Sequence, residues 1–397
     1  MRVLIAPVGE QPIPNLIPLF TTKAQKPFTL VQFMVPDDSR IREVATNLRK
    51  TIALDTTLVD VKVADKDLTM NAWDLAKACE ECKAAITSYF EEGNEVIVNL
   101  TGGTKIMALA AYQAAVNTGT PMIYVNTEQT QIIQFNEQGK PTSTQSFKAP
   151  INILTQLHAA GRELKRNPRK PLLRANDIKK NHAEFAKYLV DRYIVVYSNL
   201  IRSILDLASQ GGGQAWGRPV PFIPQGQSVD AAKRAHDTGL WIWDQTAGTI
   251  TITSKEAFEF LKGGWVEIFV LKTLADDGRF DDVLGNVEIK GFDGEGFEGE
   301  DFKGELDVVV TRNGRLGIIE CKTSGPQKGQ GLTYAVAKVR LHEVIFGGPY
   351  ATAVFALPSP EISNEWREIF DQYKLPEPIH GTKLKELANI MSSLLGP

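Results

Sequence analysis

The first 150 residues alternate between short apolar runs and amphipathic segments. Apolar runs rich in β-branched residues occupy 2–8, 29–35, 95–100, 122–126 and 131–135. Segments with helical spacing of their apolar residues occupy 39–52, 73–90 and 105–117. Strands and helices in alternation predict a mostly parallel sheet with helices on both faces, a Rossmann-like α/β layer.

The later part of the chain has a different order of elements. A long amphipathic helical pattern covers 181–209, and a β-rich stretch at 239–253 predicts a hairpin. Before that helix, residues 165–180 are basic and interrupted by proline, which fits a solvated connector or a contact with nucleic acid. The glycine- and acid-rich stretch 291–304 does not place its acids as an EF-hand does, so we expect a mobile loop there.

Two further strands are expected to form a tight hairpin that carries charged residues. The β-rich runs 308–311 and 316–319 flank Asn313-Gly314, a pair that favours the two positive φ angles of a hairpin turn. Because alternate residues of a strand share a face, Glu305 and Asp307 should point together. Glu320 and Lys322 should likewise point together past Cys321, so two acids and an amine would converge.

Such a cluster suits phosphodiester hydrolysis. That reaction needs a hard divalent cation, and carboxylates on neighbouring strands can hold one. Asp307, Glu320 and the backbone carbonyl of Cys321 are the candidate ligands of Mg²⁺ or Mn²⁺, and Lys322 would orient water or stabilise the phosphoryl oxygens. The alternative is an exposed charged strand face, but the apolar run before Glu320 indicates a buried strand, where carboxylates are usually paired or bound to metal.

The cluster resembles the D-(x)n-(E/D)-x-K signature of the PD-(D/E)xK nuclease superfamily, with Leu306 where the signature often has proline. In that superfamily the first helix often supplies a carboxylate. The resemblance therefore makes Glu267, near the start of a predicted helix after Gly263-Gly264, a further candidate catalytic residue. An acid in this position also stabilises the helix dipole without any catalytic role. On the predicted helix 332–346, Lys338 could reach a scissile phosphate.

Two loops lie at the carboxyl ends of predicted strands in the first 150 residues, where ligands of such sheets bind. They read GEQPIPN at 9–15 and TGGTK at 101–105. In the second loop two glycines permit close backbone approach, threonines donate hydroxyls, and a helix start with Lys105 favours an anion. This is the chemistry of a phosphate cradle, although a Gly-Gly turn before a helix can also be only a turn.

These two motifs resemble the ligand-binding motifs of CARF domains, the Rossmann-like sensors of cyclic oligoadenylates in type III CRISPR defence. With GLWIWD at 239–244, GGWVE at 263–267 and IECKT at 319–323, the resemblance extends to nuclease effectors in which this sensor is fused to a PD-(D/E)xK domain. It implies a homodimer that binds one cyclic tetra-adenylate and then cleaves RNA or DNA. The ligand contacts that it implies are Gly9, Gln11, Pro12, Asn15, Asn99, Thr101, Gly102, Gly103, Thr104 and Lys105.

The expected architecture is therefore α/β throughout: a Rossmann-like CARF domain at 1–150, a helical linker region at 151–238 and a restriction-endonuclease-like domain at 239–397. Lysine and arginine (44) nearly balance aspartate and glutamate (47), which excludes a polycationic coat but not a local basic patch. No apolar run reaches the length of a membrane helix or a secretory signal, so we expect a cytoplasmic protein. Cys79 and Cys82 lie on a predicted helix without further metal ligands and are expected to be ordinary helix residues.

Two other functions stay open at this point. A ligand-responsive regulator could bind nucleic acid without cutting it, with the E-x-K sequence in a structural role. A dinucleotide-dependent enzyme could use the Rossmann-like half, but the chain lacks the G-x-G-x-x-G sequence of such enzymes.

Overall fold

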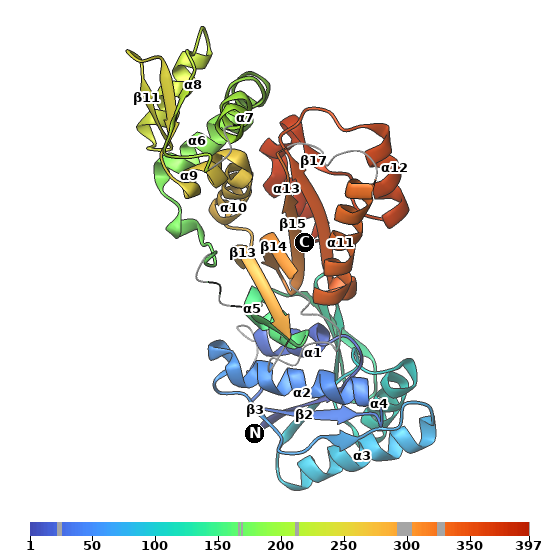
Figure 1. The fold of residues 1–397 in the computed structure, drawn as a ribbon. Coiled ribbons are helices and arrows are strands. Elements are labelled where there is room, and N and C mark those ends of the chain that lie inside the picture. Colours follow the sequence, from blue (N-terminus) through green and yellow to red (C-terminus); the bar gives the residue numbers. More distant parts are fainter. Residues whose placement is uncertain are drawn as a thin grey trace.

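A computed structural model describes residues 1–21, 26–165, 167, 170–210, 214–291, 304–323 and 330–396. Figure 1 shows an N-terminal sheet layer, a second sheet formed by the C-terminal half, and a small helical part with its own three-stranded sheet. Most of the glycine- and acid-rich stretch expected as a mobile loop, 292–303, lies outside the described residues.

The N-terminal sheet has the strand order β3-β2-β1-β5-β6-β7-β8, and β4 also pairs with β2. It is parallel from β3 to β6 and ends in two antiparallel strands. The strands are β1 (Arg2–Pro7), β2 (Leu30–Val35), β3 (Lys62–Val63), β4 (Leu68–Thr69), β5 (Glu95–Asn99), β6 (Met122–Asn126), β7 (Gln131–Phe135) and β8 (Pro141–Ser146). The helices are α1 (Ile13–Phe20), α2 (Ser39–Leu54), α3 (Leu75–Glu91) and α4 (Lys105–Thr118).

Helices cover both faces of this sheet, because alternate residues of its central strands are apolar on both sides. Leu4 and Ala6 of β1 pack in a core with α1 and α2. Val3 and Ile5 of the same strand pack in a second core with α3 and α4. In Figure 1, α2 and α3 accordingly lie on opposite sides of the sheet. The predicted Rossmann-like layer is confirmed.

The C-terminal sheet has the order β17-β16-β15-β14-β13-β9. Its strands are β9 (Arg162–Leu164), β13 (Asp282–Gly291), β14 (Gly304–Arg312), β15 (Arg315–Cys321), β16 (Ala351–Leu357) and β17 (Ile379–His380). Helices α10 (Trp265–Asp277) and α13 (Leu387–Leu394) pack on one face. Helices α5 (Ile153–Ala159), α11 (Gln330–Phe346) and α12 (Asn364–Tyr373) pack on the other.

The region between the two sheets is partly strand. Within 151–238, which was expected to be a helical linker, β9 pairs with β13 and forms one edge of the C-terminal sheet. The single long helix expected at 181–209 is divided into α6 (Lys180–Asp191), a π-helical stretch (Tyr193–Ile201) and α7 (Arg202–Ser209). The predicted hairpin at 239–253 is present, and its strands β11 (Trp241–Asp244) and β12 (Thr249–Ile252) form a separate sheet with β10 (Pro219–Pro221). Helices α8 (Ser228–Asp237) and α9 (Lys255–Glu259) lie beside it.

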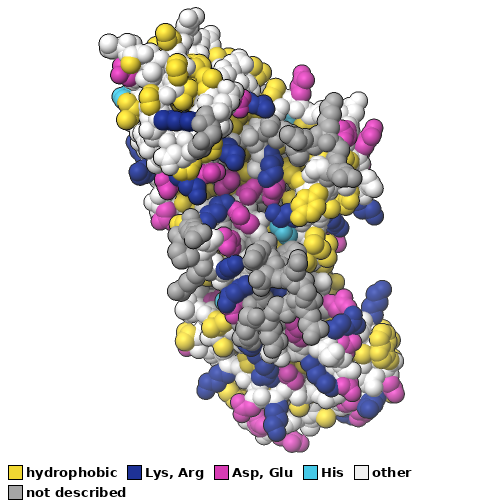
Figure 2. Space-filling model, viewed as in Figure 1, with side chains coloured by type: hydrophobic (Ala, Val, Ile, Leu, Met, Phe, Trp, Pro, Cys, Tyr) yellow, Lys and Arg dark blue, Asp and Glu magenta, His cyan; other side chains and the backbone are white. Residues whose placement is uncertain are grey.

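Acidic and basic side chains are interspersed on the face shown in Figure 2, as the nearly neutral composition suggests. Among the described residues, no helix combines the length and the apolar character needed to cross a membrane. Cys79 and Cys82 are buried on α3 with free thiols, and in the described part of the chain no group of three or more histidine, cysteine or acidic side chains is arranged to hold a metal ion.

Candidate nuclease site and ligand loops

Strands β14 and β15 form the predicted hairpin. Asn313 and Gly314 take φ angles of +49° and +78°, so the turn has the two left-handed residues that its sequence favours. Val308 pairs with Ile319 in the antiparallel ladder. Because the next positions along the two strands are Asp307 and Glu320, the register brings these two acids opposite each other.

The two acids and the lysine converge as predicted. The Nζ atom of Lys322 lies 2.5 Å from Oε1 of Glu320 and 3.9 Å from Oδ2 of Asp307. The backbone N–H of Cys321 donates to Oδ2 of Asp307 over 2.7 Å. Only 8% of the Glu320 side chain and 13% of the Asp307 side chain are exposed, so both carboxylates have lost most of their water.

Strand β14 does not keep strict alternation at Asp307. Leu306 packs in the core with α11, whereas Val308, two residues later, packs in the core with α10. The neighbouring strand has Asn286 at this level with a φ of +54°, and the β13–β14 ladder skips Asn286 and Asp307. The strand therefore changes its facing between Leu306 and Val308, at the position of Asp307. Irregularities of this kind are common beside functional sites.

The electrostatics of the cluster favour a bound cation. Burial, followed by the negative charges of Glu320 and Glu267, raises the pKa of Asp307 to about 7. Burial also raises the pKa of Glu267, against the opposing charges of Lys170 and Lys322. For Lys322, burial acts to lower the pKa, but Glu320 and Asp307 outweigh it and the pKa is raised, so the amine stays charged. Three acids thus share a largely desolvated site with the half-buried amine of Lys322.

The donor chemistry fits a hard divalent cation, since carboxylate and carbonyl oxygens are the ligands that Mg²⁺ and Mn²⁺ prefer. The oxygens are not arranged as a closed cage within the described residues, because the Lys322 amine lies between the two acids. The side chain of Cys321 faces the core with α10, and burial raises the pKa of its thiol. Its backbone carbonyl is therefore the only ligand that Cys321 is expected to supply.

A second lysine, which the sequence did not assign to this site, comes from the connector between the sheets. After β9 the chain passes along β13, where the Lys165 N–H donates to the Glu288 carbonyl over 2.8 Å. The Nζ atom of Lys170 then contacts Oε1 of Glu305, two residues before Asp307. The basic composition of 165–180 was the available signal, but nothing local indicated which lysine meets which acid.

Helix α11 borders the site from the other face. The buried His342 lies near Glu320, and burial with the nearby charge of Lys338 lowers the pKa of His342 to about 4. Arg340 of the same helix is engaged with Glu343. Lys338 is thus the basic residue of α11 whose charge acts on His342.

The two predicted ligand loops contact each other at the carboxyl edge of the N-terminal sheet. A Cβ atom on Gly9 would lie 3.0 Å from the backbone nitrogen of Gly103. A Cβ atom on Gly102 would lie 2.0 Å from the carbonyl oxygen of Pro7, which no packed structure tolerates. Gly103 itself has a φ of +78°. Glycine is therefore required at 102 by space and at 103 by backbone conformation.

Three of the predicted ligand residues hold this crossing together, and Thr104 bonds to the turn after β4. The loop at 9–15 is shorter than expected, because α1 begins at Ile13 and Asn15 lies on it. Asn15 and Asn99 are fully buried. Asn15 Nδ2 donates to the Pro7 carbonyl over 3.1 Å, and Asn99 Nδ2 donates to Asn15 Oδ1 over 2.9 Å. Thr101 Oγ1 donates to Asn99 Oδ1 over 2.8 Å. Thr104 Oγ1 donates to the Ala72 carbonyl over 3.0 Å.

The other predicted residues, except the buried Gly102, border solvent. Gly9, Gln11, Pro12 and Gly103 are partly exposed and Lys105 is exposed at the start of α4. Thr104 caps that helix by accepting from the Met107 N–H. The backbone donors of a capped helix start beside an amine favour a bound anion.

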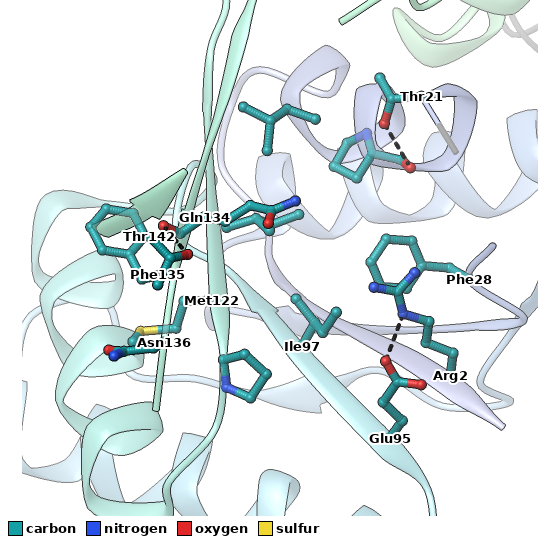
Figure 3. A pocket seen from close by; sticks show the side chains of 14 residues that line it. Arg2, Thr21, Phe28, Glu95, Ile97, Met122, Gln134, Phe135, Asn136 and Thr142 are labelled. Atoms are coloured by element: carbon teal, nitrogen blue, oxygen red, sulfur yellow. Dashed lines mark hydrogen bonds and ion pairs between the residues drawn. The ribbon is translucent and has the colours of Figure 1, made fainter. Parts of the chain in front are cut away.

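A cavity of about 420 Å³ lies elsewhere, where the parallel strands begin (Figure 3). Arg2 and Glu95 form an ion pair of 3.0 Å in its wall, and the Arg2 guanidinium also lies over the ring of Phe28. Ile97 and Met122 add apolar surface. Because Arg2 and Glu95 are at the first positions of β1 and β5, this cavity is at the opposite end of the strands from the two glycine loops.

Two family models match separate parts of the chain. Residues 3–154 match the Card1 CARF domain, and residues 254–340 match the Card1-like endonuclease domain. A search among curated proteins found no match.

Three solved structures share the fold. Protein VC1899 from Vibrio cholerae superposes with a TM-score of 0.79 and 16% identity over 99% of this chain and 98% of its own. Can2 from Sulfobacillus thermosulfidooxidans, solved in complex with cyclic tetra-adenylate, has a TM-score of 0.71 and 19% identity over 100% of both chains. A type III CRISPR defence DNA nuclease activated by cyclic oligoadenylate has a TM-score of 0.53 and 16% identity over 91% of this chain and 47% of its own.

Proposed function

Since the chain belongs to the Card1-like CARF nucleases, with a Card1 CARF domain followed by a Card1-like endonuclease domain, we propose that it is a metal-dependent nuclease activated by cyclic tetra-adenylate. The observation that carries the proposal is the buried cluster of Asp307, Glu320 and Lys322 on a hairpin whose tip rests on the CARF domain. Its setting is type III CRISPR defence, in which we infer that it cleaves RNA or DNA.

In the proposed site, Asp307, Glu320 and the Cys321 carbonyl would hold Mg²⁺ or Mn²⁺. When bound, the ion supplies stabilisation of phosphoryl charge and a water of lowered pKa. Glu267 adds a third carboxylate from α10, close enough for its charge to act on Asp307. Lys322, whose charged amine lies close to both carboxylates, would stabilise the phosphoryl oxygens of the substrate.

Contacts at the hairpin tip support coupling between the two domains. A Cβ atom on Gly314 would lie 3.2 Å from Cγ2 of Ile13 and 3.4 Å from Cγ1 of Ile17, both on α1. Arg315 Nη2 donates to the Thr127 carbonyl in the turn between β6 and β7 over 3.2 Å. Helix α1 directly follows the loop that contains Gln11, so a ligand that moves this loop would also move the end of the catalytic hairpin.

A second link lies at the end of α11. The side chain of Gln11 packs against Gly348, since a Cβ atom there would lie 3.2 Å from Nε2 of Gln11. Residue 348 leads into β16, which pairs with β15 from Leu316 to Cys321. The ligand loop and the helix that follows it therefore contact the turn before β16 and the turn between β14 and β15, which supports an allosteric rather than a constitutive nuclease.

A homodimer is part of the proposal. Helix α4, which begins at the glycine loop, exposes 58% of Leu109 and 37% of Tyr112 on the side that continues from Lys105. An apolar stripe beside the ligand loop suits a two-fold partner that would complete the site for a cyclic ligand. Light scattering of the purified protein should give the mass of two chains.

The decisive experiment measures cleavage of labelled RNA, single-stranded DNA and duplex DNA, with and without cyclic tetra-adenylate, in Mg²⁺, Mn²⁺ or EDTA. We expect cleavage that requires both ligand and metal. Ligand binding without cleavage of any of the three substrates would instead support a regulator that binds nucleic acid. Full activity in EDTA would refute the metal-dependent mechanism.

A further inference from the structure

Trp73 is the most exposed large apolar side chain among the described residues, with 83% of its surface in contact with solvent. Its place in the fold is more informative than its exposure. Strand β4 pairs with the last residues of β2, Met34 and Val35, so the turn that follows β4 emerges at the carboxyl edge of the sheet. This is the edge at which the two glycine loops lie.

The turn that carries Trp73 is held rigidly on both sides. Oδ1 of Asn71 accepts from the backbone N–H groups of Trp73 and Asp74 at 2.9 and 2.7 Å. The Asn71 N–H donates to the Glu81 carboxylate on α3 over 2.6 Å. Asp74 then caps α3 by accepting from the Lys77 N–H. An indole presented from so constrained a backbone loses little further backbone entropy when it binds a ligand.

The same turn is bonded directly to the proposed phosphate loop. Oγ1 of Thr104 donates to the carbonyl of Ala72, the residue before Trp73, over 3.0 Å. The next residue after Thr104 is the exposed Lys105 at the helix start. The backbone that carries an exposed aromatic ring is therefore bonded to a loop with anion-binding donors, and a ligand that satisfies both has a planar base joined to a phosphate.

We propose that Trp73 stacks on an adenine base of the cyclic oligonucleotide while the loop at 101–105 holds an adjacent phosphate. This inference rests on the proposed function, because it names a base-binding residue for the same ligand. Stacking recognises the aromatic face of the base, so it contributes affinity, whereas the choice of adenine is left to hydrogen bonds from other groups.

The test compares Trp73→Ala and Trp73→Phe with wild type, using calorimetric affinity for cyclic tetra-adenylate at constant salt. Loss of one stacked base should weaken binding roughly 5- to 150-fold in the alanine variant, and phenylalanine should restore part of it. Trp243→Phe, on β11 of the small sheet, is the matched control and should bind as wild type. In wild type, the ligand should quench tryptophan fluorescence. This quenching should be retained in Trp243→Phe and lost in Trp73→Phe.

Three results separate the possible failures. No binding of cyclic tetra-adenylate by wild type would refute the proposed function itself. Wild-type binding with a Trp73→Ala affinity within twofold, and unchanged quenching in Trp73→Phe, would overturn the stacking role alone. A monomeric mass for Trp73→Ala by light scattering, with quenching unchanged in a dimeric Trp73→Phe, would assign the indole to the contact with a second copy and also overturn it. The fluorescence of the phenylalanine variant keeps the test valid if the alanine variant does not fold.

Discussion

Replacing Gly102 by alanine is the sharpest test of the crossing between the two ligand loops. The new methyl group would lie 2.0 Å from the Pro7 carbonyl oxygen and about 3 Å from the side chain of Asn15. Gly102 does not have a positive φ, so alanine can adopt its backbone conformation and only space opposes the change. Cβ atoms in proteins essentially never come closer than 3.0 Å to another heavy atom. To reach that distance from the Pro7 oxygen, one of the two loops must move by about 1 Å.

Such overpacking of a buried position typically costs about 1–3 kcal/mol. For a domain of this size each kcal/mol lowers the melting temperature by roughly 2–4 °C. We therefore expect Gly102→Ala to melt roughly 2–12 °C lower by differential scanning fluorimetry. Its affinity for cyclic tetra-adenylate should fall at least about tenfold, because a site displaced by about 1 Å no longer matches its ligand.

Gly331→Ala is the matched control. A Cβ atom on Gly331 would meet nothing within 4 Å, and this residue lies within helix α11. Alanine should stabilise that helix by about 0.5–1 kcal/mol. If Gly102→Ala melts within 1 °C of wild type and binds the ligand equally well, the close crossing of the loops is wrong.

Further predictions concern the nuclease site. Lys322→Ala should lower the rate of ligand-activated cleavage by roughly 10²–10³-fold, while its calorimetric affinity for cyclic tetra-adenylate stays at the wild-type value. If the variant cleaves at the wild-type rate, Lys322 takes no part in the chemistry. Lys170→Ala should raise the KM for nucleic acid and reduce its salt dependence by about one phosphate contact. Lys290→Ala, which removes an ion pair between β13 and Glu163 of β9, should leave both quantities unchanged. Equal effects of the two variants would indicate a structural role for Lys170. Because the pKa of His342 is about 4 in the folded chain against 6.5 when unfolded, acid favours the unfolded state, which takes up the proton below pH 6.5. The free energy of unfolding should therefore fall by roughly 1.5 kcal/mol between pH 6.5 and 5 in urea titrations, and a His342→Gln variant with the same fall would assign it to other groups.

Several features of this protein were predictable from short stretches of sequence. The Asn313-Gly314 pair and its apolar flanks predicted the hairpin, because two adjacent positive φ angles favour these residues. Alternation of strands and helices predicted the parallel sheet, since both reflect which faces are buried. The E-x-K sequence predicted that Glu320 and Lys322 would lie together, because residues two apart on a strand share a face.

Other features depended on contacts between distant segments. Asn99 forms a hydrogen bond with Asn15 across 84 positions of sequence. Two residues that were predicted to contact the ligand therefore hold two segments of the fold together. Strand β9 joins the C-terminal sheet and thereby brings Lys170 to Glu305, 135 positions away. Local patterns report the backbone conformation and burial that each residue favours, whereas such pairings depend on which complete surfaces pack together. Loop closure brings many different pairs of distant segments together at a similar entropic cost. Which segments pair is therefore decided only by the packing of the folded chain.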